Sequence, residues 1–341
     1  MTTPFLRGAL TAAACAAALL AAAPALAQSA DLKGKTITVY IGYGPGGGYD
    51  LYGRLYARHA GKHIPGNPTV IASNMPGAGS LKAANYLYGV APKDGTALGI
   101  ITQTVALEEA LGTPGVTYKA PEFNFIGRLT SNVEMSFTWH TSKVKTIQDA
   151  YKIEVPVAGT GPGSAAEVYP KVLNGVLGTK FKVITGYPGS TEGMLAMERG
   201  ETDGALTSWN TLKTIKKEWL DQKKLNLLVQ YALQKHPDLP NVPTASELAK
   251  TEEERQVLNL YVSGADVGRS IVAPPKLQPA QVKMLRDAFD AMVADATFLA
   301  EIEKSKSEFD PLPGEKLQKI IVDSVAIPPA VLERAKEARG L

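Results

Sequence analysis

The chain has 341 residues, of which 45% are hydrophobic, and a formal net charge of only +3. It is therefore long enough to bury a sizeable core, and we expect two lobes rather than one. The slight lysine excess is spread along the chain, without the basic block and interleaved aromatic residues of a nucleic-acid groove, so we expect no nucleic-acid partner.

The first 27 residues have the pattern of a secretory signal peptide. Arg7 precedes an apolar run over residues 9–20 that is too short to span a bilayer, and residues 25–27 (Ala-Leu-Ala) form a cleavage site before Gln28. We therefore expect export to the periplasm. A lipoprotein anchored through Cys15 is the alternative, but the residues before Cys15 lack the usual leucine. Cleavage after residue 27 leaves no cysteine, which excludes disulfides and thiol catalysis.

The rest of the chain alternates short β-branched runs with amphipathic stretches, separated by glycine and proline, which is typical of an α/β protein. Strands are predicted at residues 36–41, 155–160, 205–209, 227–233 and 270–273. Helices are predicted at residues 51–60, at 247–258, over most of 275–306 and, as the last helix, at 317–324. In the stripe that starts near Ala165, Pro170 fits best if the first turn begins near Glu167.

A glycine loop at residues 42–48 connects the first strand to the first helix. It fits the pattern G-x-G-x-x-G, but a dinucleotide site also needs an acidic residue about twenty positions on, where this chain has Ser73 and Asn74. A tight turn without a ligand is a second interpretation. The third is an anion site, because glycines allow close approach and the free N–H groups at a helix start favour negative charge.

Asp50 stands against an anion site, since it lies in the first turn of that helix and would repel a ligand anion. We interpret it as a capping residue turned back along the helix and paired with Arg54 at i+4, although it could instead bind a ligand amine.

Two further glycine turns precede helical stretches, at residues 161–164 and 187–191. Each alone is more often a plain turn, but three in one exported, two-lobed chain favour a binding site. Chemistry is less well supported. The serines in these turns have no evident histidine partner and no G-x-S-x-G elbow is present. His59 and His63 have metal-ligand spacing, but Gly61 and Pro65 end the helix there, so we expect a solvated helix end and no metal site.

The mature chain resembles the periplasmic solute receptors of tripartite tricarboxylate transporters, the Bug family, over nearly its whole length. The resemblance rests on six segments in the family's order: GPGGGYD at 44–50, NMPGAGSLKAANYLYGVAPKDGTAL at 74–98, AGTGPGS at 158–164, GYPGSTEGMLAMERGETDGAL at 186–206, LPNVPTASEL at 239–248 and IVAPPKLQP at 271–279.

The resemblance implies a two-lobed α/β periplasmic binding protein of the type II-like, Venus-flytrap kind, with crossing hinge strands. We expect residues 1–27 to be the signal peptide, 28–137 with 258–341 to form the first lobe and 138–257 to form the second. The implied function is to bind a small di- or tricarboxylic or aromatic acid without chemistry or cofactor, as a monomer. The implied partner is a membrane permease with a large and a small integral subunit.

The resemblance also nominates binding residues, with backbone groups and water rather than charged side chains holding the carboxylate. They are Tyr43, Gly46, Gly47, Gly48 and Tyr49 in the first loop, Gly161, Ser164 and Ala165 in the facing loop, and Tyr187, Gly189 and Asp203 along the cleft. Where relatives commonly have Gly-Thr-x-Gly, this chain has Ile101 followed by Thr102, Gln103 and Thr104, which makes that wall bulkier.

Tyr43 adds a phenol near the site, which suits aromatic acids. Two other functions stay open. A receptor of this fold could report its ligand to a sensor kinase, and an exported enzyme is possible in principle, although no activated nucleophile, metal site or acid-base pair is evident.

Overall fold

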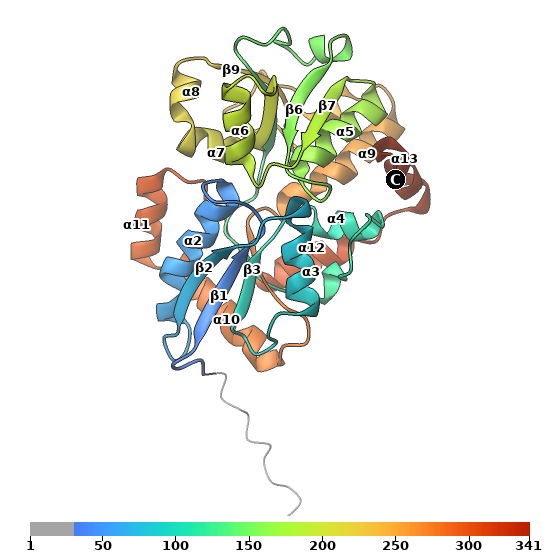
Figure 1. The fold of residues 1–341 in the computed structure, drawn as a ribbon. Coiled ribbons are helices and arrows are strands. Elements are labelled where there is room, and N and C mark those ends of the chain that lie inside the picture. The colour runs from blue at the N-terminus through green and yellow to red at the C-terminus, as the bar shows by residue number, and fades with distance from the viewer. Residues whose placement is uncertain (1–30) are drawn as a thin grey trace, which may run out of the picture. The chain divides into compact units, whose positions relative to one another are not determined.

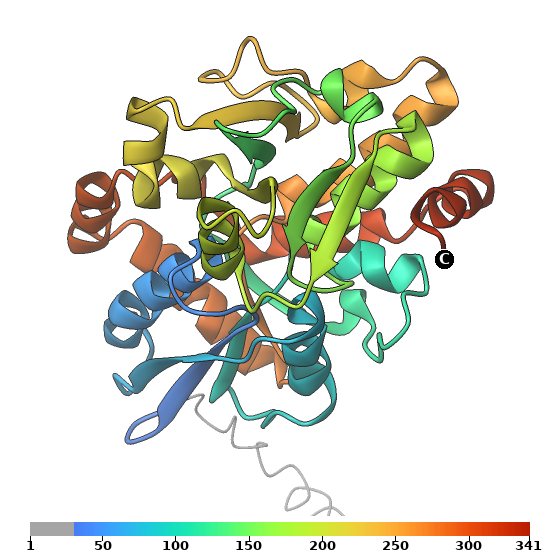
Figure 2. The same ribbon diagram turned by 45° about the horizontal axis from the view of Figure 1, so that its top comes forward.

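The computed structural model describes residues 31–341, and residues 32–341 form one compact unit. The predicted signal peptide lies outside the described residues. Within this unit two mixed sheets, each covered by helices, form two lobes (Figures 1 and 2). The predicted two-lobed α/β architecture is confirmed. Across residues 31–341 no helix is both long and apolar enough to cross a membrane.

The first lobe contains a six-stranded sheet. Its strands, in spatial order, are β11 (Leu312–Pro313), β4 (Asn124–Arg128), β10 (Ser270–Ala273), β3 (Ala97–Ile100), β1 (Thr36–Ile41) and β2 (Thr69–Asn74). Strand β1 runs parallel to β2 and β3, whereas β10 is antiparallel to β3 and β4. Around this sheet lie α2 (Gly48–Ala60), α3 (Leu81–Gly89), α4 (Val105–Ala110), α10 (Pro279–Val293), α11 (Ala296–Ser305) and α12 (Gly314–Ser324).

The second lobe contains a five-stranded sheet. Its order is β7 (Phe181–Thr185), β6 (Val155–Gly159), β8 (Gly204–Ser208), β5 (Glu134–Trp139) and β9 (Leu225–Tyr231). Strand β6 is parallel to β7 and β8, and β5 is antiparallel to β8 and β9. The helices of this lobe are α5 (Ala165–Leu177), α6 (Ser190–Glu198), α7 (Trp209–Ile215), α8 (Lys217–Asp221), α9 (Glu252–Val262) and α13 (Pro329–Arg339).

Two of the segments in which the chain passes between the lobes pair with each other. Residues 129–133 lead from β4 into β5, and residues 263–269 lead from α9 into β10. Backbone N–H groups of Leu129 and Arg269 donate to the carbonyls of Arg269 and Thr130 at 2.9 Å each, and the N–H of Asn132 donates to Ala265 at 3.0 Å. The two crossing segments therefore form a short paired hinge.

All five predicted strands are present, two of them with the predicted bounds. Three helix predictions were wrong in detail. Helix α5 begins at Ala165, so Pro170 lies inside the helix and not in its first turn. The stretch 247–258 is broken, because Thr251 caps a new helix, α9, with a capping box to Glu254. Helix α12 is not the last, since α13 follows with Pro329 at its first position.

The predicted lobe boundaries stay predictions. Strand β5, which includes residue 137, pairs with strands of the second sheet, and α13 packs on α5 and α9 of the second lobe. Gly175 permits this packing, because a Cβ there would lie 1.8 Å from the carbonyl oxygen of Ala338.

Candidate ligand-binding site

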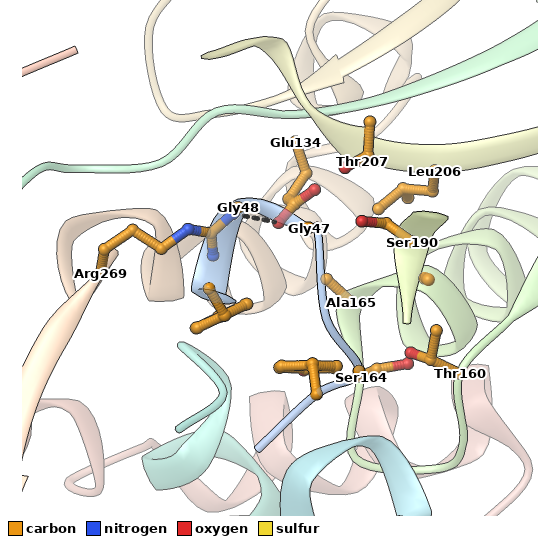
Figure 3. Close-up of a pocket in the computed structure, with 14 residues that line it drawn as sticks. Gly47, Gly48, Glu134, Thr160, Ser164, Ala165, Ser190, Leu206, Thr207 and Arg269 are labelled. Carbon is orange, nitrogen blue, oxygen red and sulfur yellow. Dashed lines mark ion pairs between the residues drawn. The ribbon is translucent and has the colours of Figure 1, made fainter. Parts of the chain in front are cut away.

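A pocket lies where the glycine loops of the two lobes meet, beside the hinge (Figure 3). Its lining combines small residues, hydroxyl groups, one cation and one anion. The lining residues are Tyr43, Gly44, Gly47, Gly48, Tyr49, Glu134, Thr160, Ser164, Ala165, Ala166, Ser190, Leu206, Thr207 and Arg269.

The first glycine loop connects β1 to α2 and leaves the start of that helix open. Gly47 is the N-cap and provides no side-chain hydrogen bond to the first turn. The N–H groups of the first turn, from Gly48 onward, have no acceptor within the helix and lie at the positive end of its dipole. A side chain at Gly48 has no room, because a Cβ there would lie 2.7 Å from Thr211 Oγ1 and 3.2 Å from Arg269 Nη2.

Asp50 supports this loop from behind. Its carboxylate accepts hydrogen bonds from the N–H of Gly46 at 2.9 Å, from Arg54 Nε at 2.9 Å and from Asn74 Nδ2 at 2.8 Å. Burial acts to raise the pKa of Asp50, but these hydrogen bonds outweigh it and hold the pKa below its ordinary value. The predicted i+4 pair with Arg54 is confirmed. The carboxylate turns back as predicted, but it accepts from the N–H of Gly46, before the N-cap, and not from an N–H group of the first turn.

The second glycine loop has the same design in the other lobe. It connects β6 to α5, and Ser164 is the N-cap of α5. Its hydroxyl donates to the carbonyl of Gly161 at 2.9 Å and accepts no hydrogen bond from the first turn of the helix. The N–H groups of Ala165 and Ala166 therefore begin the helix without an intrahelical acceptor. Both pocket loops thus present peptide N–H groups and the positive end of a helix dipole.

Direct hydrogen bonds join the two lobes around the pocket. The N–H of Gly79 donates to the carbonyl of Thr160 at 3.0 Å, and the N–H of Gly163 donates to Ala78 at 3.2 Å. On the other side, the N–H of Gly44 donates to Pro188 at 3.0 Å. Of the three glycine turns that the sequence singled out, the first therefore contacts the third, the second contacts residues 78–79, and all three contribute lining residues to the pocket.

The other nominated residues have different positions relative to the pocket. Gly46 is exposed and its N–H is taken by Asp50. Gly161 is not among the lining residues and lies against the first lobe, where a Cβ on it would be 2.5 Å from the backbone nitrogen of Gly79. Gly189 is the N-cap of α6, and Tyr187 lies two residues before it. Asp203 does not line this pocket; it lines a separate hollow and accepts from the Ser142 hydroxyl at 3.3 Å.

Thr102, Gln103 and Thr104 form a buried layer behind the pocket. The N–H of Gln103 donates to the Tyr49 hydroxyl at 2.8 Å, and Thr104 Oγ1 donates to the carbonyl of Gly163 at 2.8 Å. The hydroxyls of Thr102 and Thr104 lie 2.7 Å apart. This layer therefore positions a pocket tyrosine and the second loop.

Two charged pocket residues were missed by the sequence analysis. Arg269 is 3% exposed and Glu134 is 5% exposed, and Arg269 Nη2 lies 3.6 Å from Glu134 Oε1. The guanidinium carbon of Arg269 stands 3.8 Å from the centre of the Tyr49 ring, and that ring also stacks on Tyr43 with centres 4.5 Å apart. The one available signal was their position, since Arg269 directly precedes a buried strand and Glu134 opens another.

Hydrogen bonding at this pair is incomplete. Asn132 Nδ2 donates to Glu134 Oε1 at 2.6 Å. Arg269 Nη1 is buried and has no hydrogen-bond partner among residues 31–341. Burial raises the pKa of Glu134, although the charge of Arg269 and the hydrogen bond from Asn132 act against it. Burial also raises the pKa of the Tyr49 phenol, which stays a neutral hydroxyl.

The two spaced histidines contact acidic residues of α11. His59 Nε2 lies 2.6 Å from Glu301 Oε2, and His63 Nε2 lies 3.7 Å from Asp295 Oδ2. Within the described part of the chain, no three His, Cys, Asp or Glu side chains are arranged to hold a metal ion. The pocket offers hydrogen-bond donors, one cation and one anion, and the donors around Arg269 are suited to holding an anionic group.

Comparison with known proteins places these features in context. A sequence model of the tripartite tricarboxylate transporter family receptors matches residues 54–335. A Cupriavidus necator protein, the UPF0065 protein in the gbd 5' region, is 27% identical over 98% of both chains. Two solved structures have similar folds. The periplasmic binding protein BugD has a TM-score of 0.71 and 18% identity, covering 89% of this chain and 98% of its own. An R. palustris protein solved with adipate has a TM-score of 0.69 and 17% identity, with the same coverage.

Proposed function

Because the chain belongs to the tripartite tricarboxylate transporter receptor family, whose members are solute receptors and not enzymes, we propose that it captures a small carboxylate in the pocket between its lobes. One observation carries the proposal. The first turns of α2 and α5, from opposite lobes, and the unpartnered Nη1 of Arg269 belong to a single pocket. The adipate held by the R. palustris relative agrees with this chemical class.

The carboxylate is bound mainly by preorganised donors. Peptide N–H groups at helix starts are already oriented, and the guanidinium matches the two oxygens of a carboxylate. Arg269 is fixed before the ligand arrives, because it packs on the Tyr49 ring and beside Gly48. Little ordering entropy is then lost on binding. The receptor role, periplasmic location and delivery to a permease with a large and a small integral subunit complete the proposal.

Calorimetric titration of the purified protein with paired ligands tests the carboxylate. Adipate, other small mono-, di- and tricarboxylates, and aromatic acids are compared with their neutral amides, which have nearly the same shape. We expect at least one acid to bind while its amide binds at least about 100-fold more weakly, since charge-assisted hydrogen bonds are lost. Equal affinity of every acid and its amide contradicts the proposal.

Uptake in cells tests the partner. A strain that carries the two permease subunits should accumulate the labelled acid only when this receptor is also expressed. A receptor with Gly48→Ala, whose Cβ would lie 2.7 Å from Thr211 Oγ1 and 3.2 Å from Arg269 Nη2 in the pocket, is checked for folding by circular dichroism and should support less uptake than the wild type. Uptake that is independent of the receptor contradicts delivery to such a permease.

A further inference from the structure

The lining of the pocket contains two oppositely charged side chains next to each other, Arg269 and Glu134 (Figure 3). Arg269 is the last residue of one crossing segment, and Glu134 is the first residue of β5, directly after the other crossing segment. Both are almost fully buried, and the 3.6 Å between Nη2 and Oε1 exceeds the length of a good hydrogen bond. The pair is therefore close enough to attract but leaves hydrogen-bonding capacity on both partners.

The free capacity is of two kinds. Arg269 Nη1 is a buried donor without a partner among residues 31–341. On Glu134, Asn132 Nδ2 donates to Oε1 and Arg269 Nη2 lies 3.6 Å from the same atom, so both of these contacts are made at one oxygen of the carboxylate. Leaving a buried charged group with unmet hydrogen bonds is costly. A ligand that has both a hydrogen-bond acceptor for Arg269 and a hydrogen-bond donor for Glu134 would satisfy both side chains at once.

A ligand whose only polar group is a carboxylate can pair with Arg269 but not with Glu134. Beside Arg269 and the first-turn amides of α2, it would stand near the Glu134 carboxylate, in a setting that screens charge poorly. The summed side-chain charge of the pocket is zero, because Arg269 and Glu134 are its two charged lining residues among those described. A guest with one negative and one positive group matches that arrangement better than a guest with negative groups only.

We propose that the pocket selects solutes that carry an ammonium group next to their carboxylate, with the carboxylate on Arg269 and the amides of α2 and the ammonium on Glu134. This inference rests on the proposed function and specifies its substrate class. Glu134 is the specificity-determining residue, because its carboxylate repels acids that have no ammonium group and attracts the ammonium group of those that have one.

A purely structural pair that joins the hinge segments is the competing explanation. Such a pair needs its own hydrogen bonds satisfied, and the hinge already has backbone hydrogen bonds from Leu129, Asn132 and Arg269 to hold it. A structural pair also has no effect on which solute binds. Selectivity is therefore the property to measure.

The experiment uses matched acids titrated calorimetrically into the full exported protein at pH 7. Adipate is compared with 2-aminoadipate, and propionate with alanine, so that each pair differs by the ammonium group. We expect the amino member of at least one pair to bind ten times more tightly or better. Equal or tighter binding of the simple acid in both pairs overturns the inference and leaves the proposed function standing. If no acid of either kind binds, the proposed function itself fails.

A variant assigns the selectivity to Glu134. Glu134→Gln keeps the shape and an oxygen to accept from Asn132, and should reduce the preference for the amino member to about equal affinity while the simple acid gains or keeps affinity. Glu303→Gln, an exposed carboxylate on α11, changes the net charge by the same amount and should leave both affinities unchanged. An equal loss for both members of a pair in Glu134→Gln overturns the assignment. The wild-type comparison stands by itself if the variant fails to fold.

Discussion

Arg269 combines a binding role with a structural one. Its charge is almost fully removed from water, beside the Tyr49 ring and 3.6 Å from Glu134. Removing one member of a buried pair is more harmful than removing both, because the remaining charge stays buried without compensation. Replacing Arg269 is therefore expected to destabilise the fold mainly because the Glu134 carboxylate then stays buried without a compensating charge.

We expect Arg269→Met to lower the free energy of unfolding by about 3 kcal/mol at pH 8. Burial raises the pKa of Glu134 above its value in the unfolded chain, and loss of Arg269 raises it further. Between the pKa of Glu134 in the unfolded chain and its higher pKa in the folded variant, the folded variant binds more protons than the unfolded chain. The free energy of unfolding of the variant therefore falls as pH rises through this range. The deficit should therefore be largest above the folded-state pKa and shrink as pH falls toward about 4.5. Urea unfolding at several pH values measures it.

The double variant Arg269→Met with Glu134→Gln provides the control, since it leaves no buried charge at the pair. It should recover part of the lost stability, and its remaining deficit should not depend on pH between 5 and 8 as strongly as that of the single variant. A pH-independent deficit in Arg269→Met contradicts the account of the pair.

Individual charged residues of the site were the hardest to predict from sequence. Asp50 and Arg54 lie four positions apart on one helix, so their ion pair could be predicted from the i, i+4 spacing alone. Arg269 and Glu134 are 135 positions apart, and nothing in either segment indicates that the hinge pairs them. Such contacts depend on the tertiary fold.

At the scale of elements, the backbones of the two lobes come into direct contact where residues 78–80 meet residues 160–164. A Cβ on Gly161 would lie 2.5 Å from the backbone nitrogen of Gly79, and a Cβ on Gly79 would lie 2.5 Å from that of Ser164. Glycine is needed on both sides, because backbone atoms cannot move aside as the end of a side chain can. The approach places the second loop against the first lobe.

We expect Gly161→Ala to weaken carboxylate binding at least about tenfold, since its methyl group forces the second loop away from Gly79 and displaces the start of α5. Gly186→Ala is the matched control. Both glycines have φ of +122°, but a Cβ at Gly186 meets nothing within 4 Å. Both variants should lose stability from backbone strain, whereas affinity should fall in Gly161→Ala alone. Equal affinities, measured by calorimetry, contradict a role for this contact.

Elements were predicted well where the pattern is local and less well where neighbours decide. Strands β1 and β10 have the predicted bounds because apolar runs end at glycine or proline. Pro170 was expected to mark a first turn, yet tertiary packing of α5 extends the helix before it. Helix α13 has two buried residues, Ala335 and Ala338, so its sequence carries little periodic signal.

Across the whole unit of residues 32–341, contacts outside the pocket also hold the lobes together. The Tyr52 hydroxyl, on α2, accepts from Asn210 Nδ2 of α7 at 3.0 Å and donates to the carbonyl of Glu308 at 2.5 Å. The N–H of Glu308 donates back to Asn210 Oδ1 at 2.9 Å, and Lys213 Nζ lies 2.7 Å from Glu308 Oε1. These contacts favour the arrangement in which the lobes lie together around the pocket, which we call closed, and a ligand bound to both lobes favours it further.

We expect Tyr52→Phe to shift the receptor toward an open state and to weaken apparent affinity by about fivefold, the equivalent of one hydrogen bond. Tyr56→Phe is the control, because Tyr56 lies one turn further on α2 and its buried hydroxyl has no partner among residues 31–341. Small-angle scattering without ligand should give a larger radius of gyration for Tyr52→Phe only, and saturating ligand should abolish the difference. Identical curves and affinities for both variants contradict the closure account.

The central claim is that a carboxylate lies between the two glycine loops, in contact with Arg269. A crystal structure of the protein with the tightest-binding acid tests it most directly. We predict carboxylate oxygens within about 3.2 Å of Arg269 Nη1 and of first-turn N–H nitrogens of α2. A carboxylate bound elsewhere, for example in the hollow beside Asp203, with residues 44–49 and 160–166 contacting only water, would contradict the claim.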